Sequence, residues 1–330
     1  MKILLSGSTS FIGNALASEL IGRGHEVYAL IRPGSEHKAS CKGKGGFHIL
    51  STDINDLESR FAGCFSEKKE NEGFDLCIHL AWEGIGAAGR MDAAIQERNI
   101  RNTGVLLRLA AASGCKRFLF AGSQAEYGMT LEKIEEGACR PDVLLHEEMD
   151  CDPISEYGKA KLRVWKEASS FCKKEGMEYI HMRIFSTYGP QDHSTSLISS
   201  CVAAMREGRK LRLGACRQLW NYIYVEDCAA AIADLAFCTL GQEKESIVNI
   251  AGEDTRALYR FAEEIERIYQ REDCLCFEER LPGAEGTPFL NPSIEKLKKL
   301  TGFRPKTKFE KGIEGIEKMH RLQGKTGRAF

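Results

Sequence analysis

The first thirteen residues of the chain constrain its fold more than any other stretch. Residues 2–6 are an apolar run of strand length, and residues 7–13 then lead into an alanine- and leucine-rich stretch with helical spacing. Gly7 and Gly13 hold the first and last glycine positions of a tight turn, with Ser10 in the middle position. Free N–H groups and the positive dipole end of a helix start suit a pyrophosphate. The pattern predicts either a packed turn without a ligand or a dinucleotide site made by Gly7, Ser10, Phe11, Ile12 and Gly13.

Strand-like and helix-like segments alternate along much of the chain. Apolar runs of strand length occur at residues 25–31, 47–50, 74–81, 116–122, 179–185 and 247–250. Nearly continuous runs of this kind are typical of strands buried on both faces of a parallel sheet. The sequence predicts an α/β fold: a doubly wound parallel sheet with a smaller, mostly helical C-terminal lobe. We expect residues 1–185 to form a dinucleotide-binding domain to which 221–251 return, and residues 186–220 and 252–330 to form a substrate-binding lobe.

Composition and charge disfavour several classes of protein. The 330 residues carry a formal net charge of -1, and no lysine- and arginine-rich block is long enough to track a phosphate backbone. The sequence therefore predicts no nucleic-acid partner. No apolar run has membrane-spanning length, and the chain opens directly into a strand without a cleavable leader. We expect no membrane association and a cytoplasmic location.

The thirteen cysteines are odd in number and include no Cys-x-x-Cys pair. Such a set is typical of reduced thiols that fill a core. Cys274 and Cys276 are a weak candidate pair for a metal, and we predict no metal site.

The end of the second strand bears on the choice of cofactor. Many NAD sites place a carboxylate there to bind the ribose hydroxyls, whereas this chain has Ile31 and Arg32. A guanidinium can pair with a 2′-phosphate, so the sequence predicts NADP(H) in preference to NAD(H). The alternative is that Arg32 is a solvated turn residue.

Tyr157 and Lys161 lie four residues apart in a segment with helical spacing. Residues at this spacing share one face of a helix. Ser123 ends the strand at 116–122, at the sheet edge where α/β proteins bind ligands. Tyr-x-x-x-Lys also arises by chance as a surface pair, so the spacing alone leaves both interpretations open.

Several spaced motifs occur together and in order. They are Gly7 to Gly13, Asp53-Ile54, His79-Leu80-Ala81, Asn99, Ser123 with Tyr127-Gly128, Tyr157 with Lys161, Arg183 with Tyr188-Gly189-Pro190, and Tyr224-Val225-Glu226-Asp227. The chain resembles the extended short-chain dehydrogenase/reductase family, in particular its nucleotide-sugar epimerases, dehydratases and reductases. The resemblance implies a Rossmann-type fold, a catalytic group of Ser123, Tyr157 and Lys161, and contacts to the cofactor from Asp53, Ile54, Leu80, Ala81, Trp82, Asn99 and Ile184.

The chemistry suits those residue types. An alcohol gives hydride to a nicotinamide only as its proton leaves, so a base must lie on its oxygen. A free tyrosine has a pKa of about 10 and is a poor base at neutral pH, but a nearby lysine stabilises the phenolate. We expect Tyr157 to be the acid/base, Lys161 to tune it and hold the cofactor ribose, and Ser123 to orient the substrate oxygen.

Departures from the family pattern concern the substrate. Gln124 and Ala125 follow Ser123, where the 4,6-dehydratases have an aspartate and a glutamate, so dehydration is disfavoured. Ser186 replaces an asparagine found in many relatives, and Trp220 replaces an arginine that binds the diphosphate. Arg206, Arg209, Arg212 or Arg217 are the candidates to supply that charge. We expect the substrate to contact Trp82, Glu83, Ser123, Gln124, Ser186, Trp220, Arg206 and Arg212.

The resemblance implies oxidation or reduction at C4 of a nucleotide-activated hexose, by a 4-epimerase or a 4-ketoreductase. A reductase of a non-nucleotide carbonyl and a cofactor-binding regulator without catalysis remain alternatives. The helices at about 88–113 and from 155 carry apolar residues over a wide arc. Relatives pair these helices across a two-fold axis, so we expect a homodimer; the alternative is that the C-terminal lobe covers the extra surface.

Overall fold

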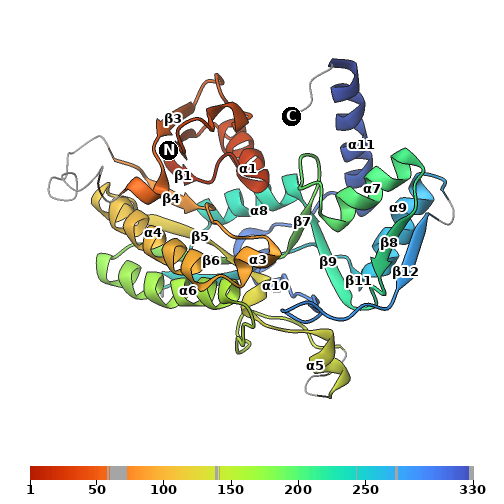
Figure 1. Ribbon diagram of the computed structural model, residues 1–330. Helices are drawn as coiled ribbons and strands as arrows, with labels where there is room; N and C mark the ends of the chain where they lie inside the picture. The colour runs from red at the N-terminus through yellow and green to blue at the C-terminus, as the bar shows by residue number, and fades with distance from the viewer. Residues whose placement is uncertain are drawn as a thin grey trace.

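A large twisted sheet with helices on both faces forms the body of the molecule, and a smaller lobe lies beside it (Figure 1). This computed structural model describes residues 1–57, 59, 73–137, 140, 142–242, 244–271 and 274–326. The sheet has the strand order β10-β6-β5-β4-β1-β2-β3, and every pairing in it is parallel. Its strands are β1 (Lys2–Ser6), β2 (Glu26–Ile31), β3 (Phe47–Ser51), β4 (Leu76–His79), β5 (Arg117–Ser123), β6 (Glu178–Ile184) and β10 (Glu245–Ile250). The predicted doubly wound parallel sheet is confirmed.

The strand order reverses between β1 and β4. From β1 the chain builds outward to β2 and β3, then crosses back to β4 and continues to β5, β6 and β10. The loops that leave β1 and β4 therefore diverge to opposite faces of the sheet and open a crevice at the carboxyl ends of these strands. This crevice is where the fold places a ligand.

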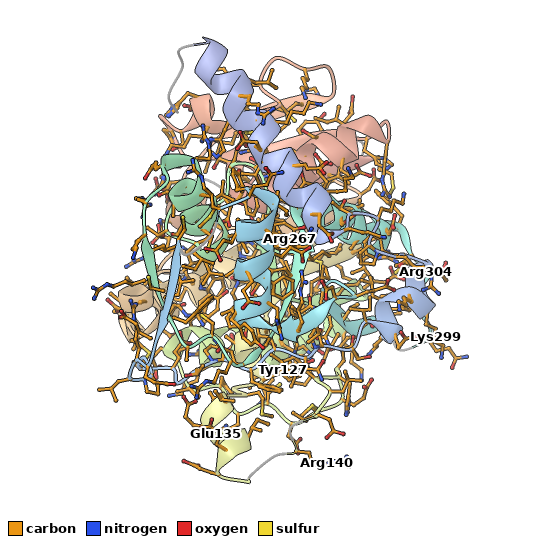
Figure 2. All side chains as sticks on the ribbon, turned by 90° about the vertical axis from the view of Figure 1, so that its right-hand side faces the viewer. Tyr127, Glu135, Arg140, Arg267, Lys299 and Arg304 are labelled. Atoms are coloured by element: carbon orange, nitrogen blue, oxygen red, sulfur yellow. The ribbon has the colours of Figure 1, made fainter. Side chains whose placement is uncertain are left out.

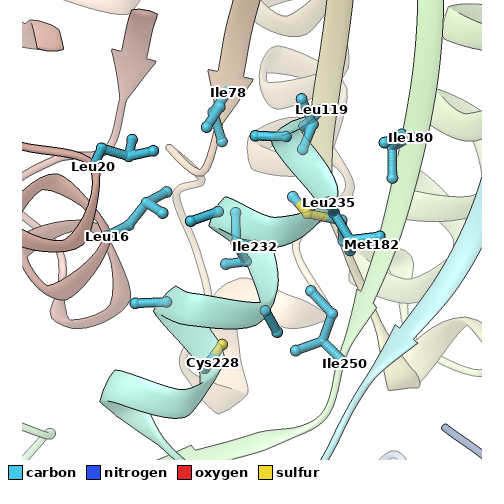
Figure 3. Packing of buried hydrophobic residues seen from close by; sticks show 14 of the residues in the cluster. Leu16, Leu20, Ile78, Leu119, Ile180, Met182, Cys228, Ile232, Leu235 and Ile250 are labelled. Carbon is cyan, nitrogen blue, oxygen red and sulfur yellow. The ribbon is translucent and has the colours of Figure 1, made fainter. Parts of the chain in front are cut away.

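Each face of the sheet has its own apolar core, because side chains alternate along a buried strand. On one face, α1 (Phe11–Gly22) and α8 (Val225–Phe237) pack against Ile78, Leu119 and Ile180 (Figure 3). On the other face, α4 (Ala93–Ala112) and α6 (Glu156–Glu175) pack against Leu4, Phe118 and Phe120. The two layers hold the crevice between them.

The smaller lobe is less helical than the sequence predicts. It contains a three-stranded sheet, β11-β9-β7, and a two-stranded sheet, β12-β8. Its elements are β7 (Ser186–Tyr188), α7 (Leu197–Glu207), β8 (Leu211–Gly214), β9 (Leu219–Tyr224), β11 (Thr255–Ala257), α9 (Leu258–Ile268), β12 (Leu275–Glu278) and α11 (Phe309–Thr326). The short α10 (Glu295–Thr301) packs on α8 and β10 beside the main sheet. Within residues 221–251, β10 and α8 lie with the main sheet, whereas β9 pairs in the small sheet. The division into domains stays a prediction.

The helix expected at about 88–113 is two helices. The short α3 (Ala87–Arg90) ends before Met91, and α4 begins after Asp92. The carboxylate of Asp92 accepts hydrogen bonds from the backbone N–H groups of Ala94 and Ile95, at 2.9 and 3.1 Å. An aspartate that binds these groups starts a new helix, so α3 takes its own direction. A further short helix, α5 (Leu131–Glu135), lies at the edge of the molecule.

Charged side chains point outward from several segments of the surface. Figure 2 shows Glu135, Arg140, Lys299 and Arg304 pointing outward from separate segments, while Tyr127 lies inside the molecule, where its hydroxyl donates to Asn249 at 2.8 Å. Within the described part of the chain, no helix combines the length and the apolar character that crossing a bilayer requires.

The apolar residues that suggested a dimer are largely covered within one chain. Val105, Leu106, Leu109 and Val164 are buried where α4 and α6 pack side by side on the sheet. Trp165 is half-buried, and its indole N–H donates to Glu245 at 3.0 Å. The wide apolar arc thus has an intrachain explanation, and the dimer stays a prediction.

Candidate active site

A cavity of ≈ 580 Å³ opens at the carboxyl ends of the central strands, where the strand order reverses. It is lined by residues from the β1–α1 turn, from the loops after β2, β3 and β4, and from β5, α6 and β7. The structure brings together most of the site residues predicted from the sequence: Gly7, Ser10, Phe11, Ile12, Arg32, Asp53, Ile54, Leu80, Ala81, Trp82, Glu83, Asn99, Ser123, Gln124, Tyr157, Lys161, Ile184 and Ser186.

The turn between β1 and α1 has no room for side chains at its glycines. Gly7 has φ +77°, and a Cβ on it would lie 2.6 Å from the backbone nitrogen of Ala81. A Cβ on Gly13 would lie 2.0 Å from the carbonyl oxygen of Gly7. The hydroxyl of Ser10 accepts from the Gly13 N–H at 3.1 Å and caps the helix. Strand and helix start are therefore held in close contact.

The first turn of α1 borders the cavity through Ser10, Phe11 and Ile12. A helix start offers N–H donors and positive potential, which fit the pyrophosphate of a dinucleotide. Asp53, which follows β3, also lines the cavity and accepts from the backbone N–H of Asn55 at 2.9 Å. The residues present fit a dinucleotide along this wall.

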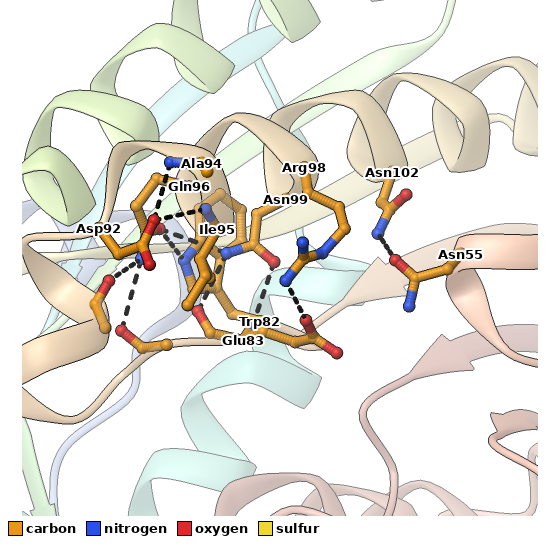
Figure 4. Close-up of polar contacts among 12 residues, drawn as sticks. Asn55, Trp82, Glu83, Asp92, Ala94, Ile95, Gln96, Arg98, Asn99 and Asn102 are labelled. Carbon is orange, nitrogen blue, oxygen red and sulfur yellow. Dashed lines mark hydrogen bonds and ion pairs between the residues drawn. The ribbon is translucent and has the colours of Figure 1, made fainter.

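Asn99 supports the loop after β4 from behind. Its side chain accepts from the Glu83 N–H at 3.1 Å and donates to the Glu83 carbonyl at 3.0 Å (Figure 4). Gln96, one turn earlier on α4, accepts from the Trp82 indole N–H at 2.8 Å. The two amides thus fix the position of Trp82 and Glu83 at the cavity wall. Gln96 is a residue that the sequence did not single out.

His79 is part of the packing beneath the cavity. Its Nδ1 lies 2.6 Å from the hydroxyl of Ser6 and its Nε2 lies 3.0 Å from the hydroxyl of Thr103. Burial, with the nearby charge of Lys161 as a second cause, lowers the pKa of His79 to about 3. The imidazole is therefore neutral at physiological pH and links β1, β4 and α4.

Lys161 is buried beside the aromatic rings of the site. Its Nζ donates to the carbonyl oxygen of Ala121 at 2.6 Å and lies 3.6 Å from the centre of the Trp82 ring. Burial lowers its pKa well below the usual lysine value, against the nearby charge of Glu126. The same side chain lies 5.6 Å from the centre of the Tyr157 ring.

Tyr157 sits between Ser123 and a cation. Burial raises the pKa of its phenol, while a hydrogen bond with Ser123 and the charge of Arg90 act to lower it. The guanidinium carbon of Arg90 lies 4.2 Å from the centre of the Tyr157 ring. Ser123, Tyr157 and Lys161 therefore line the same cavity, and their catalytic roles stay a prediction.

Glu126 is a buried carboxylate directly behind Ser123. It accepts from the Ser123 N–H at 2.8 Å, from His181 Nε2 at 2.9 Å and from Arg183 Nε at 3.0 Å. Burial raises the pKa of this carboxyl, but the charges and hydrogen bonds of His181 and Arg183 outweigh that effect, and its pKa lies below the ordinary value. Sequence reasoning missed Glu126, although Ser-x-x-Glu is the spacing of a capping box.

Arg90 and Glu285 also escaped the sequence analysis. They come from α3 and from the loop after β12, and their side chains form an ion pair with contacts of 2.5 and 2.7 Å. No local motif could have joined them, because they are far apart in the chain.

Some predicted site residues lie outside this cavity lining. Gly13 packs beneath the turn, and Trp220 lies on β9 with its ring centre 6.3 Å from that of Tyr222. Arg206 pairs with Glu317 at 3.6 Å, and Arg212 pairs with Glu278 at 3.7 Å. Both arginines face other parts of the smaller lobe.

Comparison with known proteins decides the family. Residues 3–251 match the NAD dependent epimerase/dehydratase family. The chain belongs to this family. The resemblance found in the sequence is thereby confirmed.

Relatives of the family resemble the chain along almost its whole length. An uncharacterized UDP-glucose epimerase of Bacillus subtilis is 25% identical over 331 residues, which cover 95% of this chain and 96% of that protein. The UDP-N-acetylglucosamine 4-epimerase of Methanobrevibacter ruminantium, solved with UDP-N-acetylmuramic acid, superposes with a TM-score of 0.81, 21% identity and 98% coverage of each chain. The UDP-glucuronic acid 4-epimerase of Bacillus cereus, solved with UDP-glucuronic acid and NAD, superposes with a TM-score of 0.79 and 20% identity. The match covers 98% of this chain and 100% of that protein.

The preference for NADP(H) that the sequence suggested is wrong. The family is described as NAD dependent, and the B. cereus structures hold NAD. The structure supplies a physical reason, because Arg32 lies 3.8 Å from the carboxylate of Glu83 and its side chain is 62% exposed. A nearby carboxylate opposes a 2′-phosphate, and an exposed guanidinium binds such an anion weakly.

Proposed function

We propose that the protein is an NAD-dependent enzyme that acts at C4 of a nucleotide-activated hexose, as a 4-epimerase. One observation carries the proposal: Ser123, Tyr157 and Lys161 meet in the same cavity that the first turn of α1 borders. A hydroxyl, a phenol and a buried cation beside a dinucleotide site suit oxidation of an alcohol. The family and its structural neighbours support this class of reaction.

In this proposal Tyr157 removes the proton of the C4 hydroxyl and later returns a proton to the C4 oxygen. The hydroxyl of Ser123 orients that oxygen, since it lies beside the phenol. Bound NAD supplies the hydride acceptor and donor. Lys161 places positive charge below the phenol and near the Ala121 carbonyl, where it supports the phenolate and the cofactor ribose.

The likeness to 4-epimerases of known structure favours the epimerase over a 4-ketoreductase in this proposal. An epimerase returns the hydride to its substrate and shows no net redox change, so it keeps its cofactor, whereas a reductase exchanges it at every turnover. We propose that the sugar contacts Trp82, Glu83, Gln124 and Ser186, which line the cavity near Tyr157. Dehydration is disfavoured, because Gln124 and Ala125 follow Ser123 and neither is an acid.

The experiment begins with the cofactor that the purified protein retains. We expect NAD to be released on denaturation, and we expect UDP-, dTDP-, GDP- or CDP-hexoses to raise the melting temperature of the NAD-loaded protein. NMR of the best-binding sugar should then show exchange between its C4 epimers. Loss of the 6-hydroxyl as water, with formation of a 4-keto-6-deoxy product, would contradict the proposal.

A second candidate rests on the smaller lobe. Trp220, Arg206 and Arg212 lie outside the cavity lining, so the predicted charge for a diphosphate is not supplied by them. This favours, as an alternative, a reductase of a carbonyl compound without a nucleotide. Two results together would favour this reductase: net consumption of NADH with simple ketones or aldehydes, and no change of the melting temperature with any nucleotide sugar.

We also propose that the protein is cytoplasmic and dimeric, with α4 and α6 at the two-fold axis. Gly104 on α4 is a site for testing this contact, because a Cβ there would meet only the tip of Arg108, at 3.7 Å, so that a larger side chain fits within one chain. Light scattering should give the mass of two chains, and Gly104→Arg should halve it. A single-chain mass for the unaltered protein contradicts the dimer.

A further inference from the structure

An ion pair covers the phenol of Tyr157. Arg90, the last residue of α3, places its guanidinium carbon 4.2 Å from the centre of the Tyr157 ring. Its Nε donates to Glu285 Oε2 at 2.5 Å and its Nη2 donates to Oε1 at 2.7 Å. The side chains of Arg90 and Glu285 are only 19% and 24% exposed, so solvent screens their charges incompletely.

Arg90 is the nearer of two cations that face the Tyr157 ring. Lys161 lies 5.6 Å from the ring centre, and its Nζ is directed to the Ala121 carbonyl and the Trp82 ring. Arg90 is held in place by two hydrogen bonds to one carboxylate, a geometry that fixes a guanidinium in plane and position. The positive charge close to the phenol is therefore shared between α3 and α6.

We propose that Arg90 is a positioning residue that supports the phenolate of Tyr157, and that Glu285 limits this support by neutralising part of its charge. The proposal deepens the proposed function and rests on its assignment of Tyr157 as the acid/base. Glu285 belongs to the loop between β12 and α10, so it makes the smaller lobe part of the electrostatics of the proton transfer.

The loop that carries Glu285 is anchored beside it. The backbone N–H of Thr287 donates to the Glu132 carboxylate at 3.0 and 3.2 Å, and Thr287 accepts from the Leu131 N–H at 2.8 Å. These contacts bind the loop to α5. Glu285 is thus presented to Arg90 from a fixed loop, and its charge is a built part of the site.

The other polar and charged groups around the phenol are of two kinds. Ser123, at the end of β5, is uncharged and donates or accepts a hydrogen bond. Glu126, from the turn after β5, adds negative charge, but His181 and Arg183 bind it. Together with Lys161 from α6, these groups act on the stability of the Tyr157 phenolate. Arg90 from α3 stabilises the phenolate further, and Glu285 from the smaller lobe destabilises it.

The test is a direct titration of Tyr157 in the NAD-loaded protein. Tyrosine labelled with ¹³C at the ring carbon that bears oxygen reports its own ionisation, and the resonance absent from Tyr157→Phe identifies the residue. We expect Arg90→Gln to raise the pKa of Tyr157 by roughly one unit, a tenfold loss of phenolate at a given pH. We expect Glu285→Gln to lower that pKa, and Arg90→Lys to restore most of the unaltered value.

The opposite directions of the two expected pKa shifts distinguish an effect of charge from an effect of altered structure. If the ion pair only held the loop, both variants would move the pKa in the same direction or leave it unchanged, and either result overturns the proposal. Arg163→Gln is the matched control, since Arg163 lies on α6 and pairs with Glu97 at 2.7 Å on an exposed surface. It should not move the resonance.

Activity gives an independent second readout. The rise of kcat with pH should move to higher pH in Arg90→Gln and to lower pH in Glu285→Gln. If Tyr157→Phe keeps full activity, the proposed function fails whatever the titration shows. If Tyr157→Phe is inactive and the titration shows no opposite shifts, only the role of Arg90 and Glu285 fails.

Discussion

The main sheet and the smaller lobe hold their charges in different ways. In the main sheet, which forms the rigid wall of the cavity, Glu126 and Lys161 are buried, and each is bound by backbone groups or by several side chains. In the smaller lobe, Arg212 pairs with Glu278 and Arg217 pairs with Glu279 on the exposed surface. Buried groups with several partners are costly to disturb, whereas exposed pairs contribute about 0–1 kcal/mol. The comparison teaches that charges in the main sheet are fixed by burial and by several partners, whereas these pairs of the smaller lobe are held only loosely at the surface.

The largest expected effect is on the rigid wall. Tyr157→Phe should lower turnover by a factor of about 10² to 10⁴, because the variant lacks the transferable proton. Its NAD content should remain close to that of the unaltered protein, since the ring is kept. Steady-state kinetics with NAD measured after denaturation checks both. More than about a tenth of the original turnover would rule out Tyr157 as the acid/base.

Glu126→Gln tests how much a buried charge of the main sheet contributes to stability. Removing this charge leaves Arg183 without its ionic partner, which typically costs about 3–5 kcal/mol of unfolding free energy. Denaturant titration measures the loss. Glu278→Gln is the matched change in the smaller lobe, and its exposed pair with Arg212 predicts a loss of less than about 1 kcal/mol. Equal losses would remove the distinction between the main sheet and the smaller lobe.

The pH dependence follows from the sign of the Glu126 shift. Because the folded protein holds its pKa below the ordinary value, the carboxylate stabilises the fold above the unfolded pKa of about 4.3. This contribution is lost as the pH falls through the lower folded value. Glu126→Gln should therefore flatten the acid side of the stability profile; an unchanged profile would show that another group causes it.

A smaller difference in stability is expected between alanine substitutions at two glycines of α1. Gly13→Ala should destabilise the protein by roughly 1–3 kcal/mol and weaken NAD binding, because its Cβ would lie 2.0 Å from the Gly7 carbonyl oxygen. Gly22→Ala at the end of the same helix meets nothing within 4 Å, so we expect no loss and a gain of up to about 1 kcal/mol. Thermal melts with and without NAD measure both. A harmless Gly13→Ala would show that the turn can open.

The smallest effect is expected in the smaller lobe. Arg212→Ala should change KM by less than about threefold, since the side chain is 75% exposed and surface substitutions are worth within about 0.5 kcal/mol. Kinetics with the substrate found in the sugar screen provides the check. A tenfold rise in KM would mean that the lobe brings Arg212 to the substrate during turnover, and would restore the role that the sequence predicts for it.

Local sequence was sufficient for those residues of the rigid wall that lie within one turn or one helix. Gly7 and Gly13 sit in one strand–turn–helix unit, and Tyr157 and Lys161 sit one turn apart on a single helix, so their spacing carries their geometry. The same local logic predicted the parallel sheet. It did not predict the break before α4, although the cap formed by Asp92 is itself a local signal.

The tertiary structure alone decided which distant residues share the site. Arg90 meets Glu285 although 195 positions separate them, and His181 meets Glu126 across 55 positions. It also decided that β9 joins a small sheet with β7 and β11, and that Arg206 and Arg212 face glutamates outside the cavity lining. The sequence by itself determined the strands of the main sheet and the residues whose spacing one turn or one helix sets. Contacts between segments depend on how the packed layers and the lobe meet, and no periodicity within a single segment encodes that.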